Sequence, residues 1–300
     1  MSPIVLFVYN RPSHTRRTLQ CLAQADGAAQ SDLYIFADGP RSDADSAAVA
    51  EVRQVCRSAK GFASVSLTER GRNYGLAANI VGGVGEVIGL RGTAIVIEDD
   101  VNVAPFFLRF MNSALDFYRG RGVFSIGGYT PDIQIPADYP FSTFVMHRNC
   151  SWGWATWKSE WDKLDWSVAS FDAFIRDSSA RRRFNEPGDD MSPFLLRWKT
   201  GAREMWDIVF AYAAFRAGEP HVYPRKSLVR NAGNDGSGTH VGPTTKYDAP
   251  LATSISLNSF CTGVAPDARI VAQFHRFYST SLFRRAVNAL KRWRYLCLGK

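Results

Sequence analysis

Over the first hundred residues, short apolar runs alternate with longer segments whose apolar residues recur every three or four positions. The runs have the length of buried strands, and the segments have the period of amphipathic helices. Strands that are apolar throughout are typical of a parallel sheet covered by helices on both faces. We therefore predict an α/β fold with a mostly parallel central sheet flanked by helices. The expected strands are 3–9, 32–39, 63–70 and 93–100, and the expected helices are 13–25, 45–59 and 76–89.

After residue 106 the pattern is less regular. It still predicts helices at 106–119 and 204–218 and a Gly/Asn-rich loop at 227–242. No linker separates the halves, so we expect a single domain over 1–275. Its halves would be 1–105, of nucleotide-binding type, and 106–275, packed onto the same sheet. Residues 276–300 would form a basic amphipathic tail.

Polar side chains follow three of the expected strands, at the point where each strand ends. Asn10 and Arg11 follow the first strand, Asp38 ends the second, and the acids 98–100 end the fourth. In open parallel sheets, ligands bind beyond the carboxyl ends of the strands. These side chains therefore predict a binding site at one edge of the sheet.

The three adjacent acids, Glu98, Asp99 and Asp100, repel one another unless water or a cation relieves the repulsion. Oxygen ligands suit hard cations such as Mg²⁺ or Mn²⁺. The alternative is a solvated turn whose acids start the next helix. Because the acids end a buried strand, we favour the cation.

Charge and composition narrow the choice of partner. The net charge of +8 suits an anionic partner such as nucleic acid, anionic lipid or a phosphorylated ligand. Five cysteines without a CxxC spacing favour a reducing, intracellular setting. No secretory signal pattern and no 18-residue apolar stretch is visible, so any membrane contact is expected to be peripheral.

The stretch "IVIEDDVNVAPFF" resembles the acidic signature of GT-A glycosyltransferases. It is most similar to the N-acetylglucosaminyltransferase I family and to related bacterial sugar transferases, and the resemblance covers about residues 3–245. It implies a GT-A fold, a UDP-sugar donor (N-acetylglucosamine as the first guess) and Mn²⁺ or Mg²⁺. By this resemblance Asp100 is the metal ligand, and Asp99, with Glu98, contacts the sugar or ribose.

Three further segments carry the resemblance to the donor site. "FVYNRP" implies that Asn10 and Arg11 line the nucleotide pocket, and "FADGPR" implies that Asp38 binds uracil. "RGRNYGLAANI" implies that Arg72 lies near the diphosphate or uracil, with Asn79 nearby. The alternative for each arginine is a solvated position on the surface, where most arginines lie.

"REMWDIVF" resembles the family's Trp-Asp helix motif, which supplies the general base. This implies that Asp207 takes the proton of the acceptor hydroxyl. Glu204, three residues earlier on the expected helix, is the second candidate. The alternative is that Asp207 is an ordinary exposed helix acid.

Two other segments suggest ligand contacts. Trp152 and Trp154 in "SWGWATW" could stack on an acceptor or donor sugar, or they could pack in the core. "NAGNDGSGTH" resembles the family's loop that closes on the donor, which implies that His240 contacts the diphosphate or the metal. A solvated loop histidine is the alternative.

The segment 282–300 combines an apolar arc with basic residues, the composition of a helix lying on anionic lipid. The alternative is a helix that packs back onto the domain. We expect a cytoplasmic enzyme held peripherally on the inner membrane face.

Taken together, the sequence predicts an inverting, metal-dependent glycosyltransferase that acts on a glycan or lipid-linked acceptor in surface polysaccharide synthesis. One rival is a nucleotidyltransferase, but "YNRPSHT" lacks the Gly-rich, Lys-bearing loop of that class. A nucleic-acid binder is the other rival. It is weaker because the basic residues concentrate in the tail, so no nucleic-acid partner is expected.

Overall fold

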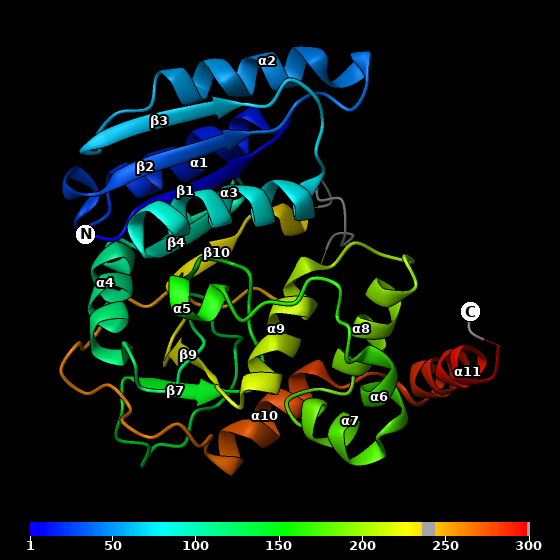
Figure 1. Cartoon of the computed structure of the whole chain (residues 1–300). Coiled ribbons are helices and arrows are strands. Elements are labelled where there is room, and N and C mark those ends of the chain that lie inside the picture. The colour runs from blue at the N-terminus through cyan, green and yellow to red at the C-terminus, as the bar shows by residue number, and fades with distance from the viewer. Residues whose placement is uncertain (236–243, 299–300) are drawn as a thin grey trace.

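The central element is a mixed eight-stranded sheet with the order β3-β2-β1-β4-β8-β6-β9-β7 (Figure 1). The structure, a computed structural model, describes residues 1–235 and 244–298. The strands of this sheet are β1 (Ile4–Val8), β2 (Asp32–Ala37), β3 (Ser64–Glu69), β4 (Thr93–Glu98), β6 (Ser125–Gly127), β7 (Thr143–Met146), β8 (Trp154–Trp157) and β9 (His221–Pro224). A separate antiparallel pair joins β5 (Val101–Val103) to β10 (Val229–Asn231).

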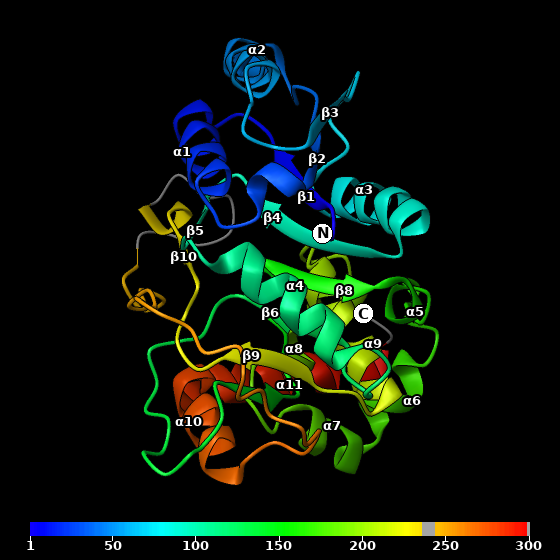
Figure 2. The same cartoon turned by 90° about the vertical axis from the view of Figure 1, so that its left-hand side faces the viewer.

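Helices cover both faces of the sheet, and α1 and α3 lie on opposite sides of β1 (Figure 2). The helices are α1 (Pro12–Ala23), α2 (Asp43–Arg57), α3 (Leu76–Arg91), α4 (Phe107–Tyr118), α5 (Lys158–Trp161), α6 (Phe171–Arg176), α7 (Ser178–Phe184), α8 (Met191–Lys199), α9 (Trp206–Ala217), α10 (Ala268–Tyr278) and α11 (Leu282–Leu298). Two short 3₁₀ turns, η1 (Ala28–Gln30) and η2 (Gly233–Asp235), complete the described elements.

The apolar run of β1 is continuous because both of its faces are buried. Ile4, Leu6 and Val8 pack in the cluster that contains α1, α2 and α4. Val5 and Phe7 pack in the opposite cluster, which contains α3 and α9. The predicted α/β class, with a central sheet flanked by helices, is confirmed, as are the four strands and three helices expected before residue 100.

The second half differs from the sequence expectation in detail. β8 runs antiparallel to both β4 and β6, and β7 runs antiparallel to β9, so the sheet is parallel only in part. The sequence pattern did not indicate β7, β9, α6, α7 or α8. Each of these two strands spans only four residues, too short for an alternation to stand out.

The C-terminal region consists of two helices. The expected boundary between domain and tail at 275/276 falls inside α10, whose Tyr278 ring lies 3.6 Å from the Arg148 guanidinium carbon. α11 contacts the α6–α9 cluster through Tyr295 and Leu296, yet none of its residues is buried. Of the expected apolar arc, Phe283 is 78% exposed and Trp293 57%.

Within the two described ranges, no helix combines the length and hydropathy needed to cross a bilayer.

The two adjacent glycines in the middle of α3 are predicted to respond oppositely to alanine. Gly82 is exposed, and a Cβ added there would meet no atom within 4 Å. A Cβ at Gly83 would lie 2.8 Å from Cε1 of Phe7 and 2.9 Å from Cδ2 of Phe36. Gly82→Ala should raise the free energy of unfolding by about 0.5–1 kcal/mol through the lost backbone freedom of glycine. Gly83→Ala should lower it by about 1–3 kcal/mol through overpacking.

Urea unfolding of both variants measures this difference. A Gly83→Ala protein as stable as Gly82→Ala would contradict the close packing of α3 on β1 and β2.

Candidate functional site

The strands β1, β2 and β4 run parallel and end at one edge of the sheet, and the first polar groups of the site follow them directly. Arg11 follows β1 and immediately precedes α1. Pro12 takes the first position of that helix, where its missing N–H leaves no hydrogen bond unmade. Asp38 follows β2, and Glu98 ends β4. The predicted convergence of these residues at one edge is therefore observed.

Arg11 supplies the cation that relieves the acid cluster. Its Nη2 pairs with Oδ1 of Asp99 and lies 3.0 Å from Oδ2 of Asp100. Both acids are buried: Asp99 is 3% exposed and Asp100 is 9% exposed. Burial lowers the pKa of Arg11, but the charges of the two carboxylates more than offset this, so its pKa is raised and the guanidinium stays charged.

The neighbouring acids hold their protons more tightly than free carboxyls. Burial raises the pKa of Asp99 to about 6, with Asp100 adding to the rise and Arg11 opposing it. Burial and the charges of Asp100 and Asp99 raise the pKa of Glu98 well above its usual value. The backbone fixes Asp99 in place, since its carbonyl accepts a 2.8 Å hydrogen bond from Oγ1 of Thr18.

Asp38 organises the loop that follows β3. Its Oδ1 accepts hydrogen bonds from the N–H of Gly39 (2.9 Å) and of Tyr74 (2.8 Å). Its Oδ2 accepts 3.1 Å bonds from Nδ2 of Asn73 and from the N–H of Gly75. All four lone-pair directions of the carboxylate are thus used by this chain itself. In this conformation Asp38 positions the 73–75 loop instead of presenting a free oxygen to a nucleobase.

Two residues predicted for the donor site, Arg72 just before this loop and Asn79 on α3, differ in exposure. The Arg72 backbone packs closely against Gly39. A Cβ added to Gly39 would lie 2.3 Å from the Arg72 carbonyl carbon. The Arg72 side chain is exposed, with its guanidinium 5.6 Å from the Tyr74 ring centre. Asn79 is buried, and its Oδ1 accepts a 3.3 Å bond from Nε of Arg70. Of the two, Arg72 is therefore the residue that is available to an anion.

Asn10 points toward α2 rather than toward the acids. Its Nδ2 donates to Oδ1 of Asp45 at 3.0 Å, and the Tyr9 hydroxyl donates to Oδ2 of Asp45 at 2.8 Å. Sequence reasoning missed Asp45 because an acid in the first turn of a helix is the ordinary pattern.

The start of the Gly/Asn-rich loop covers the acids from the other side. The Ala232 N–H donates to the Asp100 carbonyl at 2.7 Å. A Cβ at Gly233 would lie 2.2 Å from Oδ2 of Asp100 and 3.0 Å from Nη1 of Arg11. A larger residue here would displace the Asp100 carboxylate from its present position. The predicted His240 lies outside the described residues.

A second contact ties this loop to α1. Nε2 of His14 lies 3.3 Å from Oδ2 of Asp235. The sequence placed neither residue at the site. The only sequence signal was the position of His14, three residues after Arg11.

Asp207 stands in the first turn of α9, where its Oδ1 accepts a 3.0 Å hydrogen bond from the N–H of Ile208. Burial raises its pKa, although Arg148 and the backbone bond oppose the rise. The negative charge of Asp207 also raises the pKa of Glu98, and both carboxylates raise the pKa of the half-buried Cys150 thiol. Asp207 therefore lies within electrostatic range of Glu98, the first of the three acids.

Glu204 is not on the helix that the sequence predicted for it, because α9 begins at Trp206. Its side chain is exposed beside the 73–75 loop, with Oε2 3.6 Å from the position of a Cβ on Gly75. The segment before α9 thus reaches the loop that Asp38 holds.

The two predicted tryptophan platforms differ. Trp154 is 2% exposed, and its ring packs 4.9 Å from Phe210 and 5.3 Å from Trp206, measured between ring centres. This is the core position that the sequence left as the alternative, and it leaves no face open for a sugar. Trp152 is partly exposed and packs edge-on against Tyr129 and Tyr247.

Arg148 is a member of the site that the sequence did not indicate. Its guanidinium forms a two-pronged pair with Asp190, at 2.7 and 2.9 Å, and its charge acts on Asp207. Burial lowers the pKa of Arg148, and the Asp190 charge raises it beyond its usual value.

The acids match a hard cation in chemistry, but Arg11 holds an oxygen of both Asp99 and Asp100. Among the residues that the structure describes, no group of three or more His, Cys, Asp or Glu side chains is arranged to hold a metal ion. In this conformation the two carboxylates fit a guanidinium better than a divalent cation.

No protein-family model matches the chain, and no curated protein sequence matches it. Among solved structures, the chain is similar to TarS from S. aureus, with 10% identity, 76% of this chain and 36% of that chain covered, and a TM-score of 0.40. A TarS 1–349 structure in complex with UDP gives 9% identity, 76% and 59% coverage and a TM-score of 0.42.

The mannosyltransferase PcManGT from Pyrobaculum calidifontis, in complex with GDP-Man and Mn²⁺, gives 11% identity, 72% and 70% coverage and a TM-score of 0.40. The chain spans only 36% of the longer TarS chain. Values this low do not show a shared family or activity.

Removing Arg11 should strongly destabilise the protein, because two buried carboxylates would lose their counter-charge. We predict that Arg11→Gln lowers the free energy of unfolding by about 3–5 kcal/mol at pH 7. Arg16→Gln, five residues later on α1, is the matched control. It breaks an exposed 3.4 Å pair with Glu51 and should cost less than about 1 kcal/mol. Equal effects in urea unfolding would contradict the buried network.

The same variant tests whether the acids can accept a divalent cation. Mn²⁺ should restore part of the lost stability of Arg11→Gln, because the uncompensated carboxylates are hard-cation ligands. Mn²⁺ should have no such effect in Arg11→Gln/Asp100→Asn. An unchanged midpoint in both variants would argue against a metal site at these carboxylates.

Proposed function

We propose that this chain is an inverting glycosyltransferase of the GT-A type, which transfers a sugar from a UDP-sugar to a hydroxyl group. The observation that carries the proposal is that Asp207, at the start of α9, is a carboxyl with a raised pKa whose charge reaches Glu98 at the end of β4. A carboxyl group whose pKa is raised, and which has cations nearby at the edge of a sheet, is typical of an acid–base site. The resemblance of the EDD and Trp-Asp segments to glycosyltransferase motifs supplies the reaction class.

In this proposal Asp207 is the general base. It accepts the proton of the acceptor hydroxyl as the acceptor oxygen forms its bond to the anomeric carbon. The bond from that carbon to the diphosphate oxygen breaks on the opposite face, and UDP leaves with the electron pair. The raised pKa of Asp207 supports the role, because a base is most effective when its pKa lies near the working pH.

Arginines are the groups suited to receive the diphosphate. Guanidinium groups bind phosphate oxygens in a two-pronged geometry, and charge stabilisation of a leaving group is commonly the largest catalytic contribution. Arg72 is exposed at the loop that Asp38 holds. Arg11 faces the acids and could turn toward a phosphate only by leaving one carboxylate. The expected dependence on Mn²⁺ or Mg²⁺ stays a prediction, and no step here relies on a metal.

The finer parts of the proposal concern substrates and setting. The donor sugar is proposed as N-acetylglucosamine by resemblance only. The acceptor is proposed as a glycan or a lipid-linked glycan in surface polysaccharide synthesis, with the enzyme on the inner membrane face. The exposed apolar side chains and the cations of α11 are consistent with this setting.

UDP should raise the thermal unfolding midpoint of the protein. A ligand at 100 times its Kd stabilises the folded state by about 2.7 kcal/mol, which is a shift of several degrees for a chain of this size. The measurement compares UDP, GDP, CTP and a DNA duplex, each with and without Mn²⁺. The absence of a UDP response with Mn²⁺ present would overturn the donor proposal. A response to CTP alone would favour a nucleotidyltransferase, and one to DNA alone a nucleic-acid binder.

Asp207→Asn should keep UDP affinity and lose about 10²–10⁴-fold in transfer rate, because an amide cannot accept the hydroxyl proton. The rate of the parent enzyme should also fall as the pH drops below the raised pKa of Asp207, since the protonated carboxyl is no base. Glu204→Gln is the matched control and should keep most of the turnover. If Glu204→Gln is inactive and Asp207→Asn is active, the base is Glu204.

A further inference from the structure

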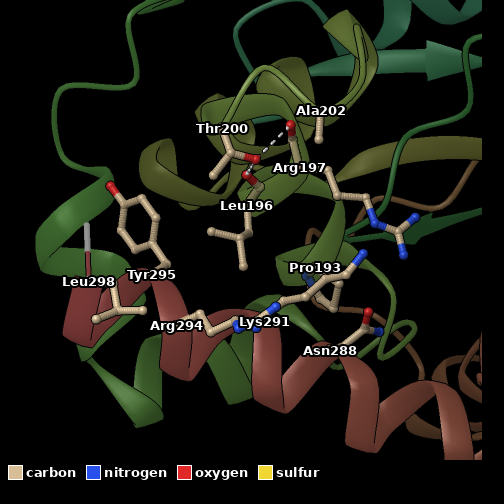
Figure 3. Close-up of a pocket in the computed structure, with 10 residues that line it drawn as sticks. All are labelled: Pro193, Leu196, Arg197, Thr200, Ala202, Asn288, Lys291, Arg294, Tyr295 and Leu298. Atoms are coloured by element: carbon tan, nitrogen blue, oxygen red, sulfur yellow. Dashed lines mark hydrogen bonds between the residues drawn. The ribbon is translucent and has the colours of Figure 1, made fainter. Parts of the chain in front are cut away.

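A cavity separates α11 from α8 (Figure 3). Its volume is about 480 Å³, within the range of about 300–1,000 Å³ typical of small-molecule sites. The lining residues are Pro193, Leu196, Arg197, Thr200, Ala202, Asn288, Lys291, Arg294, Tyr295 and Leu298.

The cavity exists because α11 is held at two separated points. Arg285 pairs with Asp189 near the start of the helix. The Tyr295 hydroxyl donates to Oδ1 of Asp172 at 2.8 Å, and the Tyr295 ring packs on Phe171. Ten residues of helix span about 15 Å between these contacts. The helix is thus anchored at both places without burying any of its own residues.

The residues that line the cavity are of two kinds, apolar and cationic. Leu196 points from α8 toward α11, and Tyr295 and Leu298 lie toward one end of the cavity (Figure 3). Arg197 and Lys291 extend toward the other end. Among the described residues that line the cavity there are three cations, including Arg294, and no acid. The apolar surface suits a hydrocarbon chain, and the unbalanced positive charge suits an anion.

The electrostatics of Arg197 agree with this reading. Burial lowers its pKa, and the nearby Arg284 and Arg203 lower it further, whereas Asp190 acts in the opposite direction. An anion in the cavity would relieve this repulsion between cations.

We propose that the cavity between α8 and α11 binds a single hydrocarbon chain that carries a phosphate-type anionic head. The chain would lie along Leu196, Tyr295 and Leu298. The head would meet Arg197, Lys291 and Arg294. A membrane phospholipid and an isoprenyl-type phosphate share this chemistry, and both are potential sources.

One residue of the cavity wall is close in the chain to the proposed base. Ala202 lines the cavity and precedes Asp207 by five residues, so their Cα atoms are at most about 18 Å apart. If the proposed transferase function holds, a lipid-linked acceptor anchored here would have its head group within reach of Asp207. Only this step depends on the proposed function, because binding to the cavity requires no donor sugar.

Calorimetric titration with dodecyl phosphate below its micelle concentration tests the proposal. We expect saturable binding with one site per chain. Dodecyl maltoside, which has the same chain and no charge, and inorganic phosphate, which has the charge and no chain, should each bind at least tenfold more weakly. Equal binding of dodecyl phosphate and dodecyl maltoside would overturn the proposal, since the cations would then play no part.

Two variants locate the site. Ala202→Trp fills the cavity from an exposed position and should abolish dodecyl phosphate binding, whereas Ala47→Trp on α2 should not. Lys291→Glu/Arg294→Glu should weaken binding at least tenfold, whereas Arg182→Glu on α7, outside the cavity, should leave it unchanged. Circular dichroism confirms that each variant is folded. Unchanged binding to folded Ala202→Trp would place the ligand elsewhere and overturn the proposal.

Anionic vesicles separate the two sources of ligand. If the occupant is a membrane phospholipid, Ala202→Trp should also bind vesicles more weakly than the parent protein. If it is a free phosphorylated chain, vesicle binding should persist while dodecyl phosphate binding is lost. UDP stabilisation measured on the same variants keeps this result separate from the donor site, because cavity variants should respond to UDP normally.

Discussion

The contact between one arginine and two buried carboxylates governs this sheet edge. Without the charge of Arg11, the two buried carboxylates of Asp99 and Asp100 would lie near each other with no counter-charge. The backbone around them is built to keep this contact. Thr18 on α1 fixes the Asp99 carbonyl, and Gly233 leaves room for the Asp100 carboxylate. Helix α1, strand β4 and the loop after β10 therefore meet at this one ionic contact.

The positions of the polar residues at this sheet edge were predictable from the sequence, because they depend only on where each strand ends. A strand buried on both faces is apolar throughout, and the residue after it is polar because the chain emerges at the sheet edge. The positions of Arg11, Asp38 and the acids followed from that rule alone. The partner of the acids did not, because a pairing between residues 11 and 99 depends on which strands are neighbours in space.

The second half of the fold was harder to predict from the sequence, because its pairings also depend on which segments are neighbours in space. Strands of four residues, such as β7 and β9, carry too few positions for a periodicity. Trp154 and Trp152 are two residues apart in one motif, yet one is in the core and the other is partly exposed. The gap beneath α11 likewise depends on anchors such as Tyr295, which touches a helix more than a hundred residues earlier in the chain.

The four hydrogen bonds to Asp38 have a consequence for recognition by the 73–75 loop. If the loop moved away, the buried Asp38 carboxylate would lose three of its four hydrogen-bond donors and keep only the N–H of Gly39. The backbone there has already lost its conformational entropy on folding. A molecule that docks against Tyr74 therefore meets a surface fixed in advance, and little of its binding free energy is spent on ordering the protein.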